Sequence, residues 1–234
     1  MLIPDRANTR VSGTYADLAS EYYDPKRHPT CANFREASRL LMVPWLRELA
    51  KNGVDVLETG AGASLMSEWL AEESRELGSF VVTDSSQEML RYSASSGICS
   101  ETIVCDAQRL PYDSSSFDLV FASLGDSYNT LPFWTEAGRI LRNSGHVLFT
   151  SPSFEWSLQF RNGSNTAEFV MSDGSVIAVP SYVESAEAQQ RMIETSGLTL
   201  VEVRTVKDTE IYRTRRSPKL RPGPIVSGYL ARKG

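Results

Sequence analysis

The sequence predicts an α/β protein with a doubly wound, mostly parallel sheet. Short apolar runs, rich in β-branched and aromatic residues, alternate along the chain with longer segments of helical period. Seven such runs occur, and the first five are almost continuously apolar, which is typical of strands that helices cover on both faces. The expected strands are residues 54–59, 80–84, 102–106, 117–123, 145–151, 198–206 and 225–231.

Helices are expected between these strands, because apolar residues recur there at helical spacing. Residues 64–77 form the helix after the first strand. The pattern Ser85-Ser86-Gln87-Glu88 is typical of a capping box with Ser85 as the cap, so another helix begins directly after the second strand. Pro132 suits a first helical turn, which predicts a helix that ends near Asn143. Residues 185–196 form the last helix.

The N-terminal segment, residues 1–53, stands outside this alternation. It contains two stretches of helical character, residues 15–22 and 33–52, with a loop between them. Pro44 is expected to kink or divide the second stretch, because proline removes a backbone donor and clashes with the preceding turn. We expect this segment to form a helical lid.

A second unusual segment, residues 154–183, interrupts the alternation near the C-terminus. Two strand-like runs, residues 168–171 and 176–179, flank Asp173-Gly174, which is a hairpin turn signal. The sequence therefore predicts an inserted β-hairpin. No linker divides the chain, so we expect one domain in which residues 54–234 form the core.

Composition and charge exclude several classes of protein. The chain has 234 residues, of which 41% are hydrophobic, enough for a sizeable core. Its net charge of -5 opposes general nucleic-acid binding, which requires clustered positive charge. No run approaches the roughly 18 apolar residues of a bilayer span, and the first residues lack the apolar stretch of a secretory signal. We therefore expect a cytoplasmic protein that is not bound to membranes.

The cysteines and histidines do not predict a metal site. Cys31, Cys99 and Cys105 lack C-x-x-C spacing and fit reduced thiols better than a disulfide framework. Only His28 and His146 could add ligands, and neither lies in a motif with metal-ligand spacing.

The sharpest chemical signal is a strand that breaks into small residues and then enters a helix. It reads Val56-Leu57-Glu58-Thr59-Gly60-Ala61-Gly62-Ala63-Ser64. Gly60 and Gly62 allow a tight turn and let a ligand approach the backbone, while the start of the helix presents N–H groups and partial positive charge. On this motif alone, an ordinary βα turn and a nucleotide site both stay open.

Two acids at the ends of the following strands favour the nucleotide site. Asp84 ends the second strand, and a carboxylate there can accept hydrogen bonds from both hydroxyls of a ribose. Asp106 ends the third strand and precedes Ala107. With Glu58 they mark the carboxyl edge at which open α/β sheets bind ligands. Each acid alone also fits a helix cap, but the three together favour a ligand.

In these stretches the chain resembles the class I S-adenosylmethionine-dependent methyltransferases. The resemblance covers about residues 54–153 and continues, in the order of strands and helices, to the C-terminus. It implies a Rossmann-like seven-stranded sheet whose last strand runs antiparallel. The matching stretches are Val56-Leu57-Glu58-Thr59-Gly60-Ala61-Gly62, Val82-Thr83-Asp84-Ser85-Ser86-Gln87-Glu88-Met89-Leu90, Cys105-Asp106-Ala107-Gln108-Arg109-Leu110-Pro111-Tyr112, Ser116-Phe117-Asp118-Leu119-Val120 and Arg139-Ile140-Leu141-Arg142-Asn143-Ser144-Gly145.

The resemblance implies S-adenosylmethionine as the cofactor and gives roles to the residues around the first loop. Glu58 would help to hold the methionine part, directly or through water. Gly60 and Gly62 would let the cofactor pass over the loop. Asp84 would hold the ribose, and the adjacent Ser85 would also bind the cofactor.

The resemblance also assigns the adenine and the reacting end of the cofactor. Met89 would pack on the adenine, whose edge would be read by Asp106 and the backbone of Ala107. Ser123 and Leu124, after the fourth strand, would lie near the sulfonium and the transferred methyl group.

Two positions depart from glycine-rich patterns. Ser64 stands where the family usually has a third glycine, but serine is small and can cap the helix, so we expect the cofactor site to be retained. Leu65 stands where the redox pattern G-x-G-x-x-G requires glycine, which disfavours nicotinamide chemistry.

Candidate residues on the substrate side follow the fourth strand and lie in the N-terminal segment. Asp126 would orient an amine or accept a proton, and His28 is the candidate general base. The alternatives are a loop carboxylate and a surface histidine. Tyr15, Tyr23 and Tyr128 are candidate substrate-binding residues, with burial in the core as the alternative.

The function favoured by these observations is methyl transfer from S-adenosylmethionine to an oxygen or nitrogen atom of a small-molecule acceptor by in-line displacement. The basic run at residues 213–221 supports the alternative of a nucleotide, RNA or protein acceptor. A non-catalytic cofactor-binding subunit is a further alternative. We expect a small-molecule partner rather than nucleic acid, in a monomer or homodimer.

Overall fold

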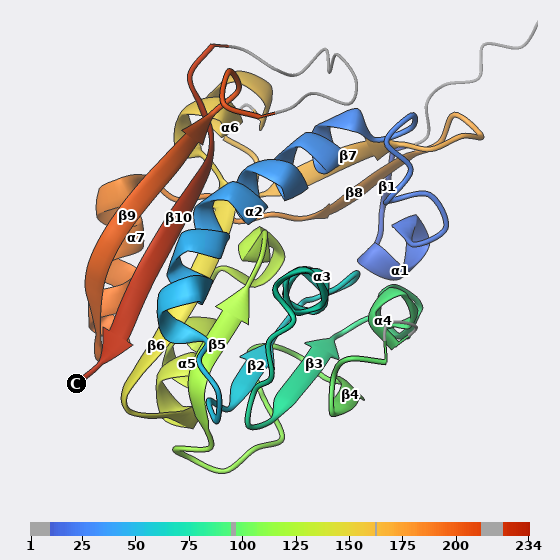
Figure 1. The fold of residues 1–234 in the computed structure, drawn as a ribbon. Helices are drawn as coiled ribbons and strands as arrows, with labels where there is room; N and C mark the ends of the chain where they lie inside the picture. Colours follow the sequence, from blue (N-terminus) through green and yellow to red (C-terminus); the bar gives the residue numbers. More distant parts are fainter. Residues whose placement is uncertain (1–9, 95–96, 162, 212–221) are drawn as a thin grey trace, which may run out of the picture.

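The main sheet has seven strands in the part of the chain that the structure, a computed structural model, describes: residues 10–94, 97–161, 163–211 and 222–234 (Figure 1). Neighbouring strands are parallel through the first five positions of the sheet, and the last strand of the chain is antiparallel to both of its neighbours. The predicted sheet is therefore confirmed. In spatial order the strands are β4 (Glu101–Val104), β3 (Phe80–Asp84), β2 (Val56–Glu58), β5 (Phe117–Ala122), β6 (Leu141–Pro152), β10 (Pro224–Lys233) and β9 (Leu198–Lys207).

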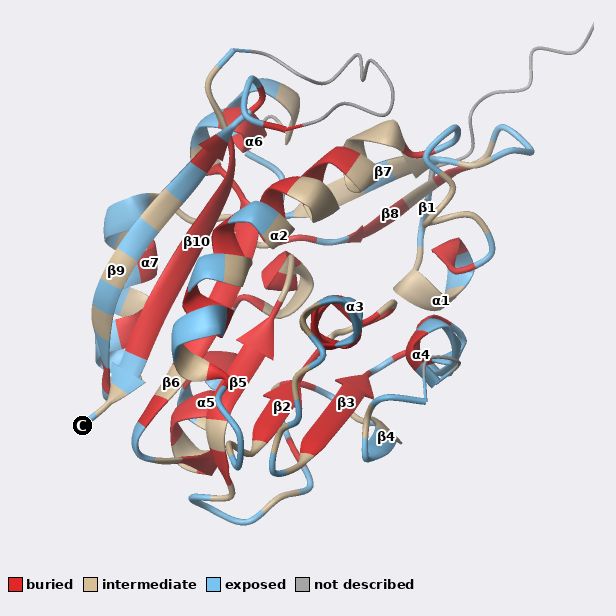
Figure 2. Ribbon diagram, viewed as in Figure 1, coloured by how far each residue is buried: buried red, intermediate tan, exposed pale blue. Residues whose placement is uncertain are grey.

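Helices cover both faces of this sheet, which confirms the doubly wound arrangement. Successive side chains of a strand point to opposite faces of the sheet, so Val56 and Leu57 belong to different hydrophobic clusters. Figure 2 shows that the middle strands are buried. One face carries α2 (Pro29–Leu49), α3 (Leu65–Glu73) and α4 (Gln87–Ala94), and the other carries α5 (Leu131–Ile140) and α7 (Ala186–Thr195).

β4 is an exception to this coverage. The expectation that helices cover both faces of each of the first five strands is wrong here, because β4 is the edge of the sheet and Val104 is 45% exposed. Between Cys105 and Ser116, all of which the structure describes, the chain forms turns and no helix. Among the described helices, only α4, the helix before β4, therefore packs against this strand, and no helix follows it to cover the other face.

The start of α4 differs from the expected capping box. Ser86, not Ser85, caps the helix, and its Oγ accepts a hydrogen bond of 3.1 Å from the Met89 N–H. The helix begins one residue later because an Asp84 carboxylate oxygen accepts the Ser86 N–H at 2.8 Å and holds the intervening turn. Ser85 is consequently exposed at the edge of the sheet.

Pro44 neither divides nor ends α2, which runs unbroken from Pro29 to Leu49. The expected division of the helix does not occur, because of where the proline lies on it. Pro44 and Leu40 both lie on the exposed face of α2, and the Leu40 carbonyl is the acceptor that loses its helical partner. Water can satisfy that carbonyl on this face.

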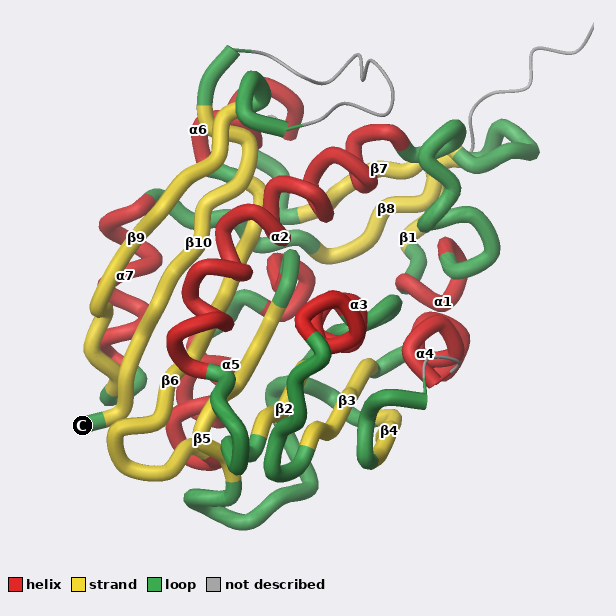
Figure 3. The backbone as a smooth tube through the Cα atoms, viewed as in Figure 1, coloured by secondary structure: helices red, strands yellow, loops and turns green. Residues whose placement is uncertain are grey.

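The two unusual segments come together in a second, smaller sheet of three strands among the described residues. β1 (Arg10–Ser12) pairs in parallel with β8 (Val176–Pro180), which pairs antiparallel with β7 (Thr166–Val170). The inserted hairpin is thus present, but the N-terminal segment is not purely helical. Figure 3 shows this sheet beside α1 (Tyr15–Leu18) and near the first turns of α2.

Side chains also join the N-terminal segment to the hairpin. The backbone N–H of Ser172 donates to the Glu21 carboxylate at 2.9 Å, and the rings of Tyr22 and Phe169 lie 5.8 Å apart. α6 (Phe154–Arg161), which the sequence pattern did not indicate, leads from β6 into the hairpin. Its Trp156 packs edge to face against Phe34 of α2.

In the described ranges, no helix combines the length and the apolar character needed to cross a bilayer. The basic run at residues 213–221 lies outside the described residues.

Candidate active site

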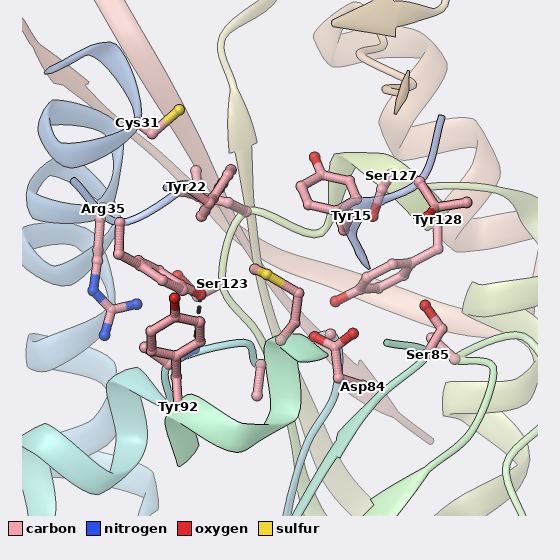
Figure 4. A pocket seen from close by; sticks show the side chains of 18 of the residues that line it. Tyr15, Tyr22, Cys31, Arg35, Asp84, Ser85, Tyr92, Ser123, Ser127 and Tyr128 are labelled. Atoms are coloured by element: carbon pink, nitrogen blue, oxygen red, sulfur yellow. Dashed lines mark hydrogen bonds between the residues drawn. The ribbon is translucent and has the colours of Figure 1, made fainter. Parts of the chain in front are cut away.

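A cavity of about 890 Å³ lies between the carboxyl edge of the main sheet and the N-terminal segment (Figure 4). Gly60, Asp84 and Ser123, which follow or end three neighbouring strands, line its floor. Strand order reverses at β2, because β3 lies on one side of β2 and β5 on the other. Such a reversal point is where open α/β sheets bind ligands.

The two glycines of the first loop permit close contact with tyrosine rings of the chain itself. Gly60 and Gly62 have φ values of 59° and 51°, which disfavour larger residues. A Cβ at Gly60 would lie 2.4 Å from a ring carbon of Tyr128, and a Cβ at Gly62 would lie 2.0 Å from the Tyr23 hydroxyl. Gly60 lines the cavity, whereas Gly62 lies beneath Tyr23 and does not.

Glu58 does not reach the cavity. Its side chain is completely buried, and its carboxyl group accepts the Leu65 N–H at 3.0 Å and the Ser64 hydroxyl. Burial raises the pKa of this carboxyl from 4.5 to about 7. Glu58 therefore holds the start of α3, where backbone N–H groups lack helical partners. The direct contact with a methionine moiety that the resemblance implied does not fit this orientation.

Asp84 is well placed for a ribose. One carboxylate oxygen accepts the Gly62 N–H at 2.9 Å and the other accepts the Ser86 N–H at 2.8 Å, so each oxygen keeps acceptor capacity. Burial raises the pKa of Asp84, while these N–H donors lower it. Figure 4 shows the Asp84 carboxylate and the Ser85 hydroxyl pointing into the cavity. These groups fit vicinal hydroxyls.

The residues expected around an adenine line the same cavity. Met89 and Ala107 are almost completely buried and offer an apolar contact from two neighbouring elements. Asp106 is exposed, and its carboxylate accepts the Gln108 N–H at 2.9 Å. An apolar slot with an acceptor at its edge fits a planar base that carries an amino group.

The wall after β5 is fixed by hydrogen bonds to distant parts of the chain. Ser123 lines the cavity, and its hydroxyl shares a hydrogen bond of 2.7 Å with Ser38 on α2. Ser38 in turn shares one of 2.7 Å with Thr150 on β6, which accepts the Leu124 N–H at 2.9 Å. Sequence reasoning missed Ser38, because a serine within a long helix carries no local signal of such contacts.

Asp126, the predicted catalytic acid, is not among the residues that line the cavity. Its carboxylate accepts the Ser181 hydroxyl and lies 3.7 Å from the Arg161 guanidinium, with both charged side chains less than a tenth exposed. Burial raises the pKa of Asp126, and Arg161 lowers it in part. Asp126 therefore links the segment after β5 to the last residue of α6 and to the residue that follows β8.

His28, the predicted general base, also lies away from the cavity lining. It precedes α2, its ring packs 5.5 Å from that of Phe169, and its Nε2 lies 3.7 Å from the Glu21 carboxylate. Burial lowers the pKa of His28 despite the neighbouring acid. The histidine helps to attach the N-terminal segment to the hairpin, and this position does not fit proton removal from an acceptor in the cavity.

The three predicted tyrosines do line the cavity, but they do not play equivalent roles. The Tyr128 hydroxyl donates to the Thr59 carbonyl at 2.7 Å, and the Tyr23 hydroxyl accepts the Ala63 N–H at 2.7 Å. Both therefore cover the glycine loop. Tyr15 is different, because its hydroxyl forms no hydrogen bond with any described residue.

Several further residues line the cavity. Tyr22, Cys31 and Pro180 are among them. Arg35 lies on the opposite side of the cavity from Tyr128 (Figure 4). Their positions depend on how α2 and the hairpin pack, so no local spacing indicates them. Among the described residues, no three histidine, cysteine, aspartate or glutamate side chains form a group that could hold a metal ion.

Comparison with known proteins agrees with the geometry. Residues 57–149 match the family of methyltransferase domains. The chain is 24% identical over 153 residues to the ubiquinone/menaquinone biosynthesis C-methyltransferase UbiE of Paraburkholderia phymatum, covering 63% of this chain and 62% of that protein. It is 28% identical over 125 residues to UbiE of Bordetella parapertussis, covering 47% and 48%. The chain thus spans less than two thirds of these relatives.

Solved structures share the fold at lower sequence identity. An S-adenosylmethionine-dependent methyltransferase of Clostridium acetobutylicum superposes with a TM-score of 0.65 at 15% identity, covering 94% of this chain and 99% of that chain. One from Methanosarcina mazei gives 0.62 at 14% identity, covering 81% and 97%.

The fold is that of the S-adenosylmethionine-dependent methyltransferases with which it superposes. Within that fold, residues 57–149 match the family of methyltransferase domains.

The buried carboxyl of Glu58 predicts a specific dependence of stability on pH. Its pKa is about 7 in the folded chain and 4.5 ordinarily, so its contribution to stability is present at low pH and is lost as the pH rises from 4.5 through 7. The loss amounts to about 3 kcal/mol by pH 8. Urea denaturation at pH 5 and pH 8 should show a larger loss in wild type than in Glu58→Gln. Equal losses of stability in the two proteins would contradict the raised pKa of the Glu58 carboxyl.

The pair of Asp126 and Arg161 predicts a large structural effect. Asp126→Asn leaves a buried guanidinium without its counter-charge, so the free energy of unfolding should fall by about 3–5 kcal/mol. Arg161→Met should act similarly, and the double variant should lose less than the sum. The matched control is Glu73→Gln, which breaks the exposed pair with Arg47 and should change stability far less. Equal effects of the two carboxylate variants would show that Asp126 is not held as described.

Proposed function

We propose that this protein transfers the methyl group of S-adenosylmethionine to an oxygen or nitrogen atom of a small-molecule acceptor by in-line displacement. The observation that carries the proposal is that one cavity is lined both by Asp84, placed for a ribose, and by Tyr15 of the N-terminal segment. A nucleoside cofactor and an acceptor can therefore lie in line within the same space.

The described residues fit this cofactor. Asp84 would accept the ribose hydroxyls, Met89 and Ala107 would enclose the base, and Asp106 would accept its amino group. When bound, S-adenosylmethionine supplies an activated methyl group on a positively charged sulfur. The protein's contribution is then to orient the acceptor and to exclude water.

The acceptor half of the cavity supports a small molecule. Tyr15, Tyr22, Cys31 and Pro180 line it, and the smaller sheet lies over this side of the site. Aromatic and apolar walls beneath a cover suit a compact ligand better than an extended polymer. The alternative of an RNA or protein acceptor rests on residues 213–221, which lie outside the described residues.

This proposal does not require proton removal by His28 or Asp126. His28 and Asp126 lie outside the cavity lining, so we propose that they position the lid and the acceptor wall. Transfer to an amine or to an already ionised oxygen then depends on orientation and desolvation. A carbon acceptor is the second candidate, because the relatives from Paraburkholderia and Bordetella are named C-methyltransferases.

Removal of the Asp84 carboxylate should weaken cofactor binding. Asp84→Ala loses charge-assisted hydrogen bonds to the ribose, so the affinity for S-adenosylhomocysteine should fall about 10- to 100-fold. Calorimetric titration measures it, and thermal melting establishes that the variant is folded. Asp113→Asn is the matched control, because Asp113 is exposed at the opposite edge of the sheet. Undiminished affinity in Asp84→Ala would reject the proposed cofactor site.

The acceptor class is tested by turnover. The purified protein, supplied with S-adenosylmethionine, should release S-adenosylhomocysteine with members of a mixed set of phenols, amines and quinones. Product masses and fragmentation identify the methylated atom. Turnover with RNA or protein and none with small molecules would overturn the proposed acceptor class.

A further inference from the structure

Three hydroxyl groups and one backbone N–H form a chain of hydrogen bonds behind the wall that follows β5. The Leu124 N–H donates to Thr150 Oγ1 at 2.9 Å. Thr150 shares a hydrogen bond of 2.7 Å with Ser38, and Ser38 shares another of 2.7 Å with Ser123. Ser38 and Thr150 are completely buried, whereas Ser123 lines the cavity. The chain therefore ends at a hydroxyl that a ligand can reach.

The direction of the inner hydrogen bond follows from counting donors and acceptors. The Leu124 N–H can only donate, so Thr150 Oγ1 is its acceptor and the Thr150 hydrogen needs an acceptor of its own. Within the described part of the chain, the one other partner of this hydroxyl is Ser38. If Ser38 donated instead, the Thr150 hydrogen would be buried without an acceptor, which costs free energy. Thr150 therefore donates to Ser38.

The same count fixes the hydrogen bond between Ser38 and Ser123. Ser38 Oγ accepts the Thr150 hydrogen, and the single hydrogen of Ser38 is also buried and needs an acceptor. Ser123 Oγ is the only oxygen that remains for it among the described residues. Ser123 therefore accepts from Ser38, and its own hydrogen has no acceptor in the described ranges. Ser123 lies at the cavity wall in Figure 4, so the chain presents one O–H donor to the ligand space.

The backbone beside Ser123 is held in a conformation that side chains disfavour. Leu124 has a φ of 55°, in the left-handed region. A leucine stays there only where its surroundings fix it, and such positions cluster at ligand sites. Its N–H is the group that Thr150 binds, so the chain of hydrogen bonds fixes both the turn and the direction of the Ser123 hydroxyl.

Ser123 is also at a suitable distance from the proposed ribose site. Asp84 ends β3 and Ser123 follows β5, and β2 lies between these two strands. Adjacent strands are about 4.8 Å apart, so the two side chains leave the sheet roughly 10 Å from each other. A ribose held at Asp84 and the sulfur on its 5′ carbon can bridge this distance.

We propose that the Ser123 hydroxyl donates a hydrogen bond to the acceptor atom itself, and that this atom is an oxygen. The inference rests on the proposed function and narrows its acceptor class to phenols and similar ionisable hydroxyl compounds. An ionised oxygen has three lone pairs, so one can accept the Ser123 hydrogen while another attacks the methyl carbon. A neutral amine has one lone pair, which must form the new bond, and a carbon acceptor has none to spare at the reacting atom.

The transfer step balances without a base. A bond forms between the acceptor oxygen and the methyl carbon as the bond from sulfur to carbon breaks, and that electron pair stays on the sulfur as a neutral thioether. An oxygen that is ionised before it binds has no proton to lose. Ser123 keeps its hydrogen and is the catalytic residue, whereas Ser38 and Thr150 are positioning residues.

Two probes of similar shape that differ in the reacting atom test the proposal. 4-Nitrophenolate presents an ionised oxygen and 4-nitroaniline an amine, and each is titrated at about pH 8 into protein saturated with S-adenosylhomocysteine. Wild type should bind nitrophenolate more tightly. Ser123→Ala should weaken nitrophenolate binding about 10- to 100-fold and nitroaniline binding less than about twofold. The matched control is Ser157→Ala, because this buried hydroxyl donates to the Phe154 carbonyl outside the cavity lining.

The absorption spectrum of bound nitrophenolate tests the positioning residues. A hydrogen bond to its oxygen moves the absorption band to shorter wavelength. Thr150→Val removes the hydroxyl that starts the chain, so the band should move to longer wavelength and the affinity should fall about threefold or more. Ser38→Ala should act in the same way. Thr150→Ser keeps the hydroxyl and should leave the band and the affinity unchanged.

Several results would overturn the proposal. Equal losses for the two probes in Ser123→Ala would show that Ser123 supports the fold rather than the acceptor oxygen. Wild type that binds nitroaniline as tightly as nitrophenolate, or that binds neither probe, would reject an oxygen acceptor. An unchanged spectrum in both Ser38→Ala and Thr150→Val would reject the positioning roles. Wild type that fails to bind S-adenosylhomocysteine would instead reject the proposed function, and the affinity of each variant for this ligand shows that it is folded.

Discussion

The shape of the site depends on one buried carboxyl group. Glu58 ends β2 and accepts hydrogen bonds from the first residues of α3, so strand and helix are held together across a very short loop. The chain can make this turn only with left-handed backbone, which Gly60 and Gly62 adopt. The same turn brings the Gly62 N–H to Asp84 on the neighbouring strand. Asp84 is therefore oriented by the loop, and the loop by Glu58.

The parts of the site that could be predicted are those with local causes. The order of strands and helices follows from apolar periodicity, and Asp84 and Asp106 follow from the position at which a strand ends. β1 has no such signal, because it is three residues long and pairs with a hairpin strand more than 150 residues further along the chain. Pairing of this kind depends on tertiary packing rather than on local sequence.

The roles of the two catalytic candidates could not be predicted from the sequence either. His28 and Asp126 were selected because their side chains titrate, yet side-chain type does not reveal the direction in which a residue points. Both are buried in contacts that attach the N-terminal segment, the hairpin and α6 to one another. Arg35 shows the converse, since an arginine on an amphipathic helix ordinarily faces solvent. Its position in the cavity lining follows only from the packing of α2 beside α3.

The two halves of the cavity come from different parts of the chain. The proposed cofactor half belongs to residues 57–149, which match the methyltransferase domains, whereas Tyr15, Tyr22, Cys31 and Pro180 of the acceptor half lie outside that range. Acceptor preference can therefore change through these segments without disturbing Asp84 or the loop.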